Sequence, residues 1–468
     1  MVFSSIVFLF TFLPLVLLLY FLIPRPAKNI VLLAASLIFY AWGEPVYVFL
    51  MLLSILLNYF CGLEIAERAE QGQMARGIFF FSIAVNLGLL GFFKYAGFLV
   101  QMLNGLLHVK LPAPDLDLPV GISFYTFQIL SYVIDVYRKK VKVQKNLVAF
   151  GLYVTMFPQL IAGPIVRYED IEGQLEKRRV TWDKFGSGSV LFVQGLAKKV
   201  LLANMAGELF SQVSGMPQGS ISVLTAWLGC LGYTFQIYFD FSGYSDMAIG
   251  LGRMFGFRFP QNFDYPYTSR SITEFWRRWH ISLGTWFREY VYIPLGGNRV
   301  GPARHIRNIM TVWLLTGLWH GASWNFVVWG LYYGVILLAE KFVLQRVLSR
   351  LPGFILHLYS LFLILIGWVF FFSPSLSEAI RYLGAMFGQK GAAYVDAEGI
   401  YLLLSNLFLL LLLSLCSTPV VRRCFRRFPE RCGWLKIAFH CGIYGLLFFL
   451  CLARLVTETY NPFLYSSS

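Results

Sequence analysis

The stretch TVWLLTGLWHGASWNFVVWGLYYGVILLA, from Thr311 to Ala339, decides the class of fold. Its 29 residues include no Asp, Glu, Lys or Arg, and His320 is its only imidazole. A bilayer core about 30 Å thick needs about 20 apolar residues in a helix. The run therefore predicts a helix at membrane depth, with His320 well inside the hydrocarbon. An ionisable side chain there is costly, so it marks a functional site by default.

The composition of the whole chain supports a membrane protein. Of 468 residues, 57% are apolar and only 13% are charged, whereas soluble domains carry roughly 25% charged residues. This balance excludes a conventional nucleic-acid-binding protein, a secreted disulfide scaffold and a disordered chain. The seven cysteines are scattered and form no C-x-x-C pair, so we expect neither a metal site nor a disulfide framework.

Apolar runs recur along the chain and predict an all-α bundle of about 11–12 spans, with re-entrant or interfacial helices. The first run has no basic leader or cleavage site, so we expect a retained span with an outside N-terminus. The runs at 30–42 and 119–134 are short enough to be re-entrant or buried within the bundle. The runs lie near 3–23, 30–42, 45–63, 77–93, 119–134, 146–166, 190–207, 221–239, 309–338, 354–373, 400–416 and 437–456.

The net charge of +15 comes from 39 Lys and Arg against 24 Asp and Glu. Much of the excess lies in short segments between apolar runs, which is the pattern of cytoplasmic loops in membrane proteins. We therefore interpret it as an orientation signal and expect no nucleic-acid partner. The main segments are Arg138, Lys139, Lys140, Lys142 and Lys145, then Arg422, Arg423, Arg426, Arg427, Arg431 and Lys436.

The segment 257–307 breaks the apolar pattern. It holds eight arginines, three acidic residues and no lysine, a balance of 8 − 3 = +5, together with Trp276, Trp279 and Trp286. We expect helical pieces that lie at the interface or dip into the bundle. An interfacial belt would also collect Arg and aromatic residues, but guanidinium groups suit carboxylates and phosphates better than lysine does.

Glycines flank His320 at helical spacing. Gly317 and Gly321 form one small-xxx-small pair, and Gly330 and Gly334 form another, a spacing that lets a second helix come close. His320 then either hydrogen-bonds across a helix contact or, as a neutral buried imidazole, acts as a general base. His280 is the second candidate, and only folding can bring it near His320. The other histidines, His108, His305, His357 and His440, are taken as ordinary.

A third cluster, YFDFSGYSD at 238–246, ends an apolar run with two carboxylates, Asp240 and Asp246. Carboxylates at the mouth of a span need partners, and we expect the arginines of 257–307 to supply them. Two neighbouring carboxylates can also flank a glycosidic bond or hold a divalent ion. The sequence shows no further acidic cluster here that would favour either.

At these clusters the sequence resembles the membrane-bound O-acyltransferases, in particular the bacterial branch typified by the alginate O-acetylase membrane subunit. Long ungapped strings carry the resemblance over most of the chain, most densely from about 118 to 335. They are MVFSS at 1–5, FYAW at 39–42, FFKYAGF at 92–98, LPVGISFYTF at 118–127, FPQLIAGP at 157–164, YFDFSGYSDMAIGLG at 238–252, SITEFWRRWHISLGTWFREY at 271–290, LGGNR at 295–299 and GLWHGA at 317–322.

The resemblance implies one transmembrane domain over 1–468, with a catalytic core at about 118–340 and helices around a central tunnel. It implies that His320 is the signature histidine and His280 the second one. No bound cofactor or metal is expected; the co-substrate would be an acyl thioester, acetyl-CoA or an acyl carrier protein, docked through the arginine-rich stretch. Candidates for lining the tunnel or binding substrate are Asp240, Tyr244, Asp246, Glu274, Trp276, Arg277, Trp279, Asn298 and Trp319.

The resemblance further implies a multi-pass protein of the bacterial cell membrane that moves an acyl group from a cytoplasmic thioester. The expected acceptor is an extracytoplasmic polysaccharide such as alginate, cellulose or peptidoglycan, or a partner acetyltransferase, and acetyl is the expected group. D-alanyl transfer toward teichoic acid is the nearest alternative. A proton-coupled transporter or lipid flippase using the buried histidine, and an idle scaffold for polysaccharide export, stay open on the residues alone.

Overall fold

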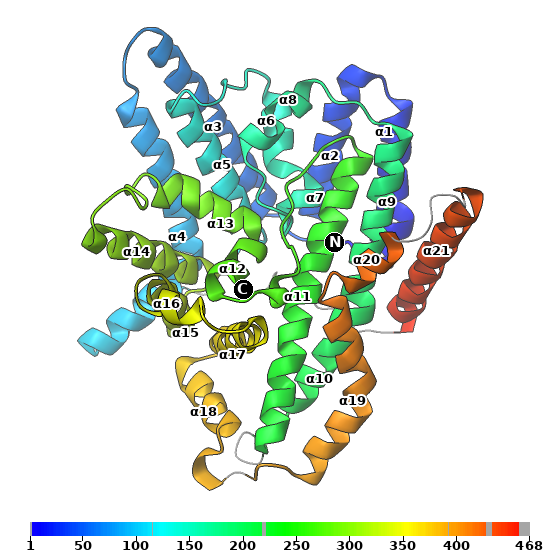
Figure 1. The fold of residues 1–468 in the computed structure, drawn as a ribbon. Helices are drawn as coiled ribbons and strands as arrows, with labels where there is room; N and C mark the ends of the chain where they lie inside the picture. Colours follow the sequence, from blue (N-terminus) through cyan, green and yellow to red (C-terminus); the bar gives the residue numbers. More distant parts are fainter. Residues whose placement is uncertain (1, 115, 218–220, 392, 427–432, 458–468) are drawn as a thin grey trace. The chain divides into compact units, whose positions relative to one another are not determined.

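The computed structural model describes all residues except 1, 115, 218–220, 392, 427–432 and 458–468. Across these described ranges the chain is helical and contains no β-strand. It divides into two compact units. Of the described residues, unit 1 comprises those within 2–192 and 244–260, and unit 2 comprises those within 193–243 and 261–457. The all-α class expected from the sequence is confirmed (Figure 1).

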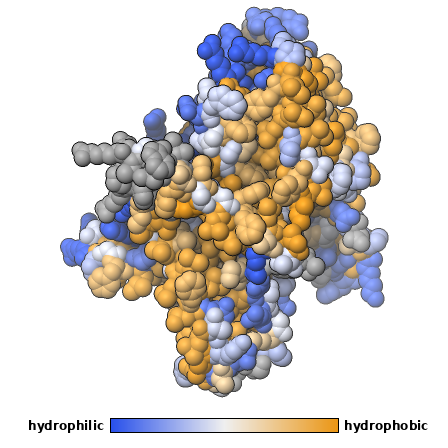
Figure 2. Space-filling view, turned by 90° about the vertical axis from the view of Figure 1, so that its right-hand side faces the viewer, coloured by the Kyte–Doolittle hydropathy of each residue, from blue (hydrophilic) through white to orange (hydrophobic). Residues whose placement is uncertain are grey.

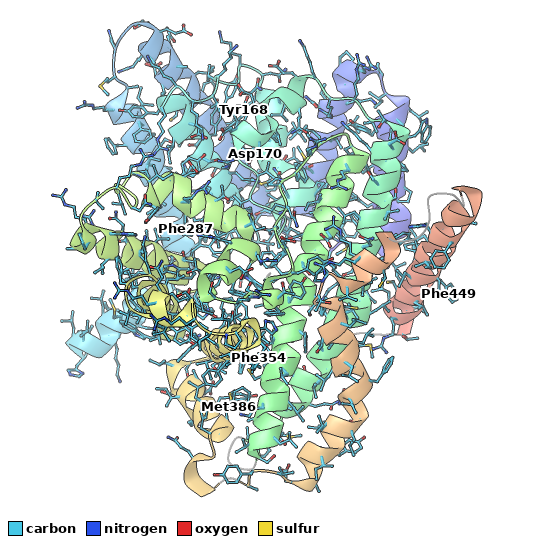
Figure 3. The ribbon with its side chains drawn as sticks, in the orientation of Figure 1. Tyr168, Asp170, Phe287, Phe354, Met386 and Phe449 are labelled. Carbon is cyan, nitrogen blue, oxygen red and sulfur yellow. The ribbon has the colours of Figure 1, made fainter. Side chains whose placement is uncertain are left out.

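In the described chain, unit 1 contains eight α-helices, most of a ninth and the C-terminal end of α11 (Val223–Met254). The first nine are α1 (Leu13–Leu22), α2 (Lys28–Ala41), α3 (Tyr47–Glu70), α4 (Arg76–Leu107), α5 (Ile122–Tyr137), α6 (Leu147–Thr155), α7 (Phe157–Leu160), α8 (Tyr168–Glu176) and α9 (Trp182–Ala197). Helix α5 lies at the centre of the unit, since 14 of its 16 residues are buried. Of the two positions left open for the short run at 119–134, re-entrant or buried, the helix takes the buried one. Figure 3 labels Tyr168 and Asp170 on α8, which packs against α5.

Polar side chains join the two long helices α3 and α4. The Asn86 side-chain amide and the Ser82 hydroxyl both donate to Asn58 Oδ1, at 2.8 and 2.7 Å. All three residues are buried. In an apolar surrounding such bonds between helices add specificity to packing, because the polar groups have no water to satisfy them.

Unit 2 holds the remaining helices. They are α10 (Asn204–Ser214), α11 (Val223–Met254, which continues into unit 1), α12 (Ile272–Arg278), α13 (Ile281–Phe287), α14 (Pro302–His320), α15 (Trp324–Ala339), α16 (Gln345–Leu348), α17 (Gly353–Phe372), α18 (Leu376–Met386), α19 (Ala397–Cys416), α20 (Val420–Arg426) and α21 (Gly433–Thr457). The short helices α12 and α13 confirm helical pieces within 257–307.

Seven helices of the described chain are long and apolar enough to cross a membrane. They cover 47–70, 76–107, 182–214, 324–348, 353–372, 397–416 and 438–457, and a shorter apolar helix covers 8–22. The sequence suggested about twelve spans because runs such as 119–134 and 146–166 are apolar; they form short helices buried inside the protein. Apolar residues cover much of the face shown in Figure 2, as expected of a surface in contact with lipid.

The expectation of one helix over 309–338 is wrong. The run forms two helices, α14 and α15, which pack against each other, and Gly321 to Ser323 separate them. At Gly321 the ring of Phe326 occupies the space that a Cβ would need. His320 is therefore the last residue of α14, at a break between two helices, rather than in mid-helix.

Close packing at the predicted glycines is confirmed. A Cβ on Gly317 would lie 3.3 Å from the Cα of Gly330, and it would clash with the carbonyl oxygen of Phe326. A Cβ on Gly330 would clash with the carbonyl oxygen of Trp313. The glycines thus let the two backbones meet one turn away from His320.

Candidate active site

His280 occupies a strained position between two short helices. Helix α12 begins after Ser271, whose hydroxyl caps it by accepting from the backbone of Glu274 at 3.0 Å. It ends at Arg278, and α13 begins at Ile281. His280 itself has φ +45°, in the left-handed region that non-glycine residues rarely adopt. Figure 3 labels Phe287, on the helix that follows. Such strain persists where surrounding contacts fix the residue, often at functional sites.

Hydrogen bonds around Asn262 fix the protonation of the His280 ring. Asn262 Oδ1 accepts from the backbone N–H of Ser282 at 3.2 Å and from the Ser282 hydroxyl at 2.9 Å. A backbone N–H can only donate, so this atom is the amide oxygen. His280 Nδ1 lies 3.1 Å from the same oxygen. Nδ1 therefore carries the hydrogen, and Nε2 is the basic nitrogen of the ring.

Burial keeps His280 uncharged. Its side chain is 2% exposed, and the loss of solvation lowers its pKa to about 3. The ring of Phe241 stands edge-on at 4.7 Å between centroids. A neutral imidazole with this tautomer can accept a hydrogen bond from a substrate hydroxyl through Nε2 without titrating near neutral pH.

His320 is enclosed by aromatic rings. The ring centroids of Trp319, Trp329 and Phe371 lie 5.0, 5.0 and 5.1 Å from that of His320. The His320 side chain is buried. These rings come from α14, α15 and α17, so three helices shape the surroundings of one imidazole.

Trp319 joins the two histidines. Its ring lies 6.1 Å from the ring of His280 and 5.0 Å from that of His320. The fold therefore brings together two imidazoles forty positions apart, with one buried indole in contact with both. Proximity of this kind is a requirement for a shared site, and the sequence left it open.

An aromatic cluster next to His320 was missed by the sequence analysis. Trp276, Trp329 and Tyr333 stack edge-to-face, with centroids 4.9 to 5.5 Å apart. Only Trp276 was a candidate. The sequence feature that could have indicated Trp329 and Tyr333 is their spacing, because residues four apart lie on the same face of a helix.

Glu340 anchors the helix that leads to His280. Its carboxylate accepts from the backbone N–H of Ile272 at 2.7 Å and of Thr273 at 2.9 Å, and from the Thr273 hydroxyl at 2.6 Å. A carboxylate at a helix N-terminus satisfies unpaired donors and complements the helix dipole. Glu340 is the first charged residue after the uncharged run, and this position was the only sequence signal.

The structure pairs Asp240 with a lysine that lies outside the arginine-rich segment 257–307. Asp240 pairs with Lys199, with Nζ to Oδ1 at 2.8 Å, and both side chains are buried. Lys199 also donates to Asn204 Oδ1 at 3.1 Å. The lysine lies in an apolar run counted as a span, so its charge was not considered as a partner. The pair binds the π-helical segment Lys198–Ala203 to α11.

The other residues predicted to bind substrate lie in different parts of the structure. Tyr244 and Asp246 belong to unit 1, and Tyr244 stacks on Phe3 at 4.6 Å. Trp279 is buried against Trp368 in unit 2. Glu274 forms an ion pair with Arg278 at 2.8 Å.

Arg277 and Asn298 are exposed. Asn298 precedes α14, and His320 is the last of the 19 residues of that helix. At 1.5 Å per residue, the length of α14 separates Asn298 from His320 by about 28 Å. The structure therefore brings His280, Trp319, His320 and Trp276 into one cluster and leaves Asn298 at the far end of α14.

No group of three or more His, Cys, Asp or Glu side chains within the described ranges is arranged to hold a metal ion. The titratable side chains of the cluster are the two imidazoles, each surrounded by aromatic rings. Such a site suits proton transfer to or from a neutral substrate group.

Comparison with known proteins identifies the family of this chain. The model of the membrane-bound O-acyltransferase (MBOAT) family matches residues 142–375, half of the chain. A probable alginate O-acetylase of Azotobacter vinelandii is 45% identical over 391 residues, covering 83% of this chain and 78% of that protein. A peptidoglycan O-acetyltransferase of Helicobacter pylori is 35% identical, covering 84% and 81%. A teichoic acid D-alanyltransferase of Streptococcus thermophilus is 29% identical, covering 48% and 58%.

The family match, the bacterial relatives and the seven apolar helices of the described chain show a multi-pass protein of the bacterial membrane. The chain belongs to the membrane-bound O-acyltransferase family and is an O-acyltransferase.

Proposed function

We propose that this protein transfers acetyl groups from a cytoplasmic thioester, acetyl-CoA or an acyl carrier protein, to hydroxyls of an extracytoplasmic polysaccharide. A partner acetyltransferase is the alternative recipient of the acetyl group. The observation that carries the proposal is the cluster of two buried imidazoles around Trp319. The identity to an alginate O-acetylase over most of the chain supports acetyl as the group transferred.

In the proposed reaction His320 takes the proton of the acceptor hydroxyl. The oxygen then attacks the thioester carbonyl carbon, an ester C–O bond forms, and the C–S bond breaks. The proton on His320 passes to the leaving sulfur, so the imidazole returns to its neutral form. Exclusion of water by the rings of Trp319, Trp329 and Phe371 protects the thioester from hydrolysis.

His280 has a positioning and polarising role in this scheme. Its Nδ1–H is committed to Asn262, so the ring offers Nε2 as an acceptor for a neighbouring hydroxyl of the acceptor sugar and orients that sugar, while His320 takes the reacting proton. The Trp276 and Trp319 indoles are donors of the kind that stabilise a developing oxyanion. The strain at His280 and the anchoring of α12 by Glu340 hold this geometry before substrate arrives.

The direct test uses purified protein in liposomes with acetyl-CoA labelled in the acetyl group and an alginate oligosaccharide. We expect label in an ester on the oligosaccharide, and we expect none when His320→Gln replaces the wild type. His108→Gln is the matched control, because His108 is exposed at the end of α4. Proton flux with no covalent product would contradict the proposal and favour a transporter.

D-alanyl transfer is the second candidate, because a teichoic acid D-alanyltransferase matches 48% of the chain. The same liposomes distinguish the two when they are supplied with a D-alanyl-charged carrier protein. The acetylation proposal predicts labelled product with the acetyl donor and none with the D-alanyl donor. Product with the D-alanyl donor alone would replace it.

A further inference from the structure

Unit 1 contains a group of three cations that lies outside the candidate active site. Arg25 lies between α1 and α2, Lys28 begins α2, and Arg178 follows α8. Lys28 is close enough to Arg25 and Arg178 for its charge to be repelled by both. In the part of the chain that the structure describes, none of the three forms an ion pair with a carboxylate. A group of uncompensated cations favours an anionic partner.

Arg178 is fixed by hydrogen bonds, yet one of its nitrogens is not used. Nε donates to the Tyr20 hydroxyl at 3.1 Å and to the carbonyl oxygen of Phe255 at 3.2 Å. Nη1 donates to Asn29 Oδ1 at 2.6 Å. Nη2 is buried and has no hydrogen-bond partner among the described residues. A buried donor of a charged group is costly when it is left unpaired, so Nη2 indicates a ligand that accepts a hydrogen bond.

Aromatic rings gather the cations. The guanidinium carbon of Arg178 lies 4.3 Å from the ring centroid of Phe257 and 5.7 Å from that of Tyr20. Lys28 Nζ lies 4.5 Å from the same Tyr20 centroid. Contact with the ring faces attracts the two charges without neutralising them. Both cations therefore remain able to bind an anion at Tyr20.

The surroundings of these residues are those of a membrane boundary. Leu18 and Leu22, in the last two turns of α1, are 57 and 72% exposed. Trp182, at the start of α9, is 89% exposed. Its ring lies 6.5 Å from that of Phe185, which in turn lies 5.8 Å from the ring of Phe21. Exposed tryptophan beside exposed apolar side chains is typical of the level where lipid headgroups meet the hydrocarbon.

We propose that Arg178 and Lys28 bind the phosphate of an anionic phospholipid. The phosphate oxygens accept from Arg178 Nη2 and pair with the Lys28 ammonium, and an acyl chain lies along the exposed apolar side of α1. Guanidinium groups suit phosphate oxygens in geometry and charge, and basic pockets between apolar helices bind lipid headgroups. Free phosphate offers the same oxygens but gains nothing from Leu18 and Leu22, so the surroundings favour the lipid.

The test measures binding of phosphatidylglycerol to the full-length protein in detergent by native mass spectrometry, which requires no turnover. Lys28→Gln removes a cation whose ammonium makes no hydrogen bond to the described residues, so the fold is expected to persist. Arg178→Lys keeps the charge but removes the guanidinium Nη2. We expect each variant to weaken phosphatidylglycerol binding about tenfold, the usual effect of losing one charge-assisted contact. Arg76→Gln, at an exposed arginine of α4, is the control and leaves the affinity unchanged.

Three results would overturn the proposal. Equal phosphatidylglycerol affinity in the wild type and in both site variants means that the lipid binds elsewhere. An equal loss in Arg76→Gln means that binding follows the overall charge of the protein. Inorganic phosphate that binds as tightly as the lipid, and that the same substitutions weaken, assigns the site to a free anion. Because neither acyl donor nor acceptor is present, none of these results depends on the proposed acyl transfer.

Discussion

The single residue with the clearest pH signature is His280. Burial lowers its folded pKa to about 3 from a usual 6.5. Between those values the unfolded chain holds a proton that the folded protein cannot, so stability falls as pH decreases from 6.5 and is constant above it. The slope for one proton is about 1.4 kcal/mol per pH unit.

We therefore predict that His280→Gln flattens the decline in thermal stability between pH 6.5 and 4.5. Thermal unfolding of the wild type and the variant in matched buffers measures it. His108→Gln, on an exposed segment, serves as the control and keeps the wild-type slope. An unchanged slope in His280→Gln would show that the ring is charged or solvated in the folded state.

The buried pair of Lys199 and Asp240 gives a second prediction at this scale. Replacing one partner removes this ion pair while the other charge stays buried, so Lys199→Met alone is expected to cost about 3–5 kcal/mol. The double variant Lys199→Met with Asp240→Leu removes both charges and is expected to be more stable than either single variant. The interaction is measured by thermal unfolding of four proteins: the wild type, Lys199→Met, Asp240→Leu and the double variant. Additive losses in the double variant would contradict a direct interaction.

Among the helices, α12 has the strongest influence on the candidate active site, because its position sets the position of His280. Glu340→Gln keeps the size of the side chain but replaces one acceptor oxygen by a donor, which opposes an N–H or O–H at Ile272 or Thr273. We predict a fall in kcat for acetyl transfer of about tenfold with KM for the donor unchanged, because His280 is displaced while donor binding is not.

Exposed Glu398, in the first turn of α19, provides the matched control for Glu340. Glu398→Gln is expected to leave both kinetic constants at the wild-type values. A rise in KM for the donor in Glu340→Gln, with kcat unchanged, would mean that Glu340 acts on donor binding and not on the orientation of α12.

The contact of α14 with α15 gives a second prediction for elements. Gly317→Ala inserts a methyl group against the carbonyl of Phe326 and the Cα of Gly330. Forced separation of the helices is expected to cost about 1–3 kcal/mol and to lower the thermal midpoint. Gly445→Ala, at an open position of α21, is expected to be neutral or slightly stabilising. Equal midpoints for the two variants would contradict close packing at Gly317.

For the whole molecule, the sequence predicts the class of fold from the scarcity of charge and the length of the apolar runs. It also predicts the helix contact at Gly317 and Gly330, because small residues four apart allow backbones to approach. It does not predict the break after His320, since the Gly321 to Ser323 turn is as uncharged as its flanks.

The sequence also does not predict contacts between residues that are far apart along the chain. Lys199 meets Asp240 and Trp319 meets His280 only through the fold, and no local periodicity encodes either contact. Asn298 looks close to the histidines along the chain, yet the length of α14 separates it from His320. In a chain that is apolar along most of its length, the hydrophobic pattern does not indicate which distant residues meet.

The central claim is that His320 is the base of an acyl transfer. The most direct measurement is the initial rate of ester formation by purified His320→Gln, with labelled acetyl-CoA and an alginate oligosaccharide, alongside its thermal midpoint. The account predicts a loss of about 10²–10⁴-fold in rate, the usual contribution of a general base, at an unchanged midpoint. A stable variant that forms ester at the wild-type rate would contradict it.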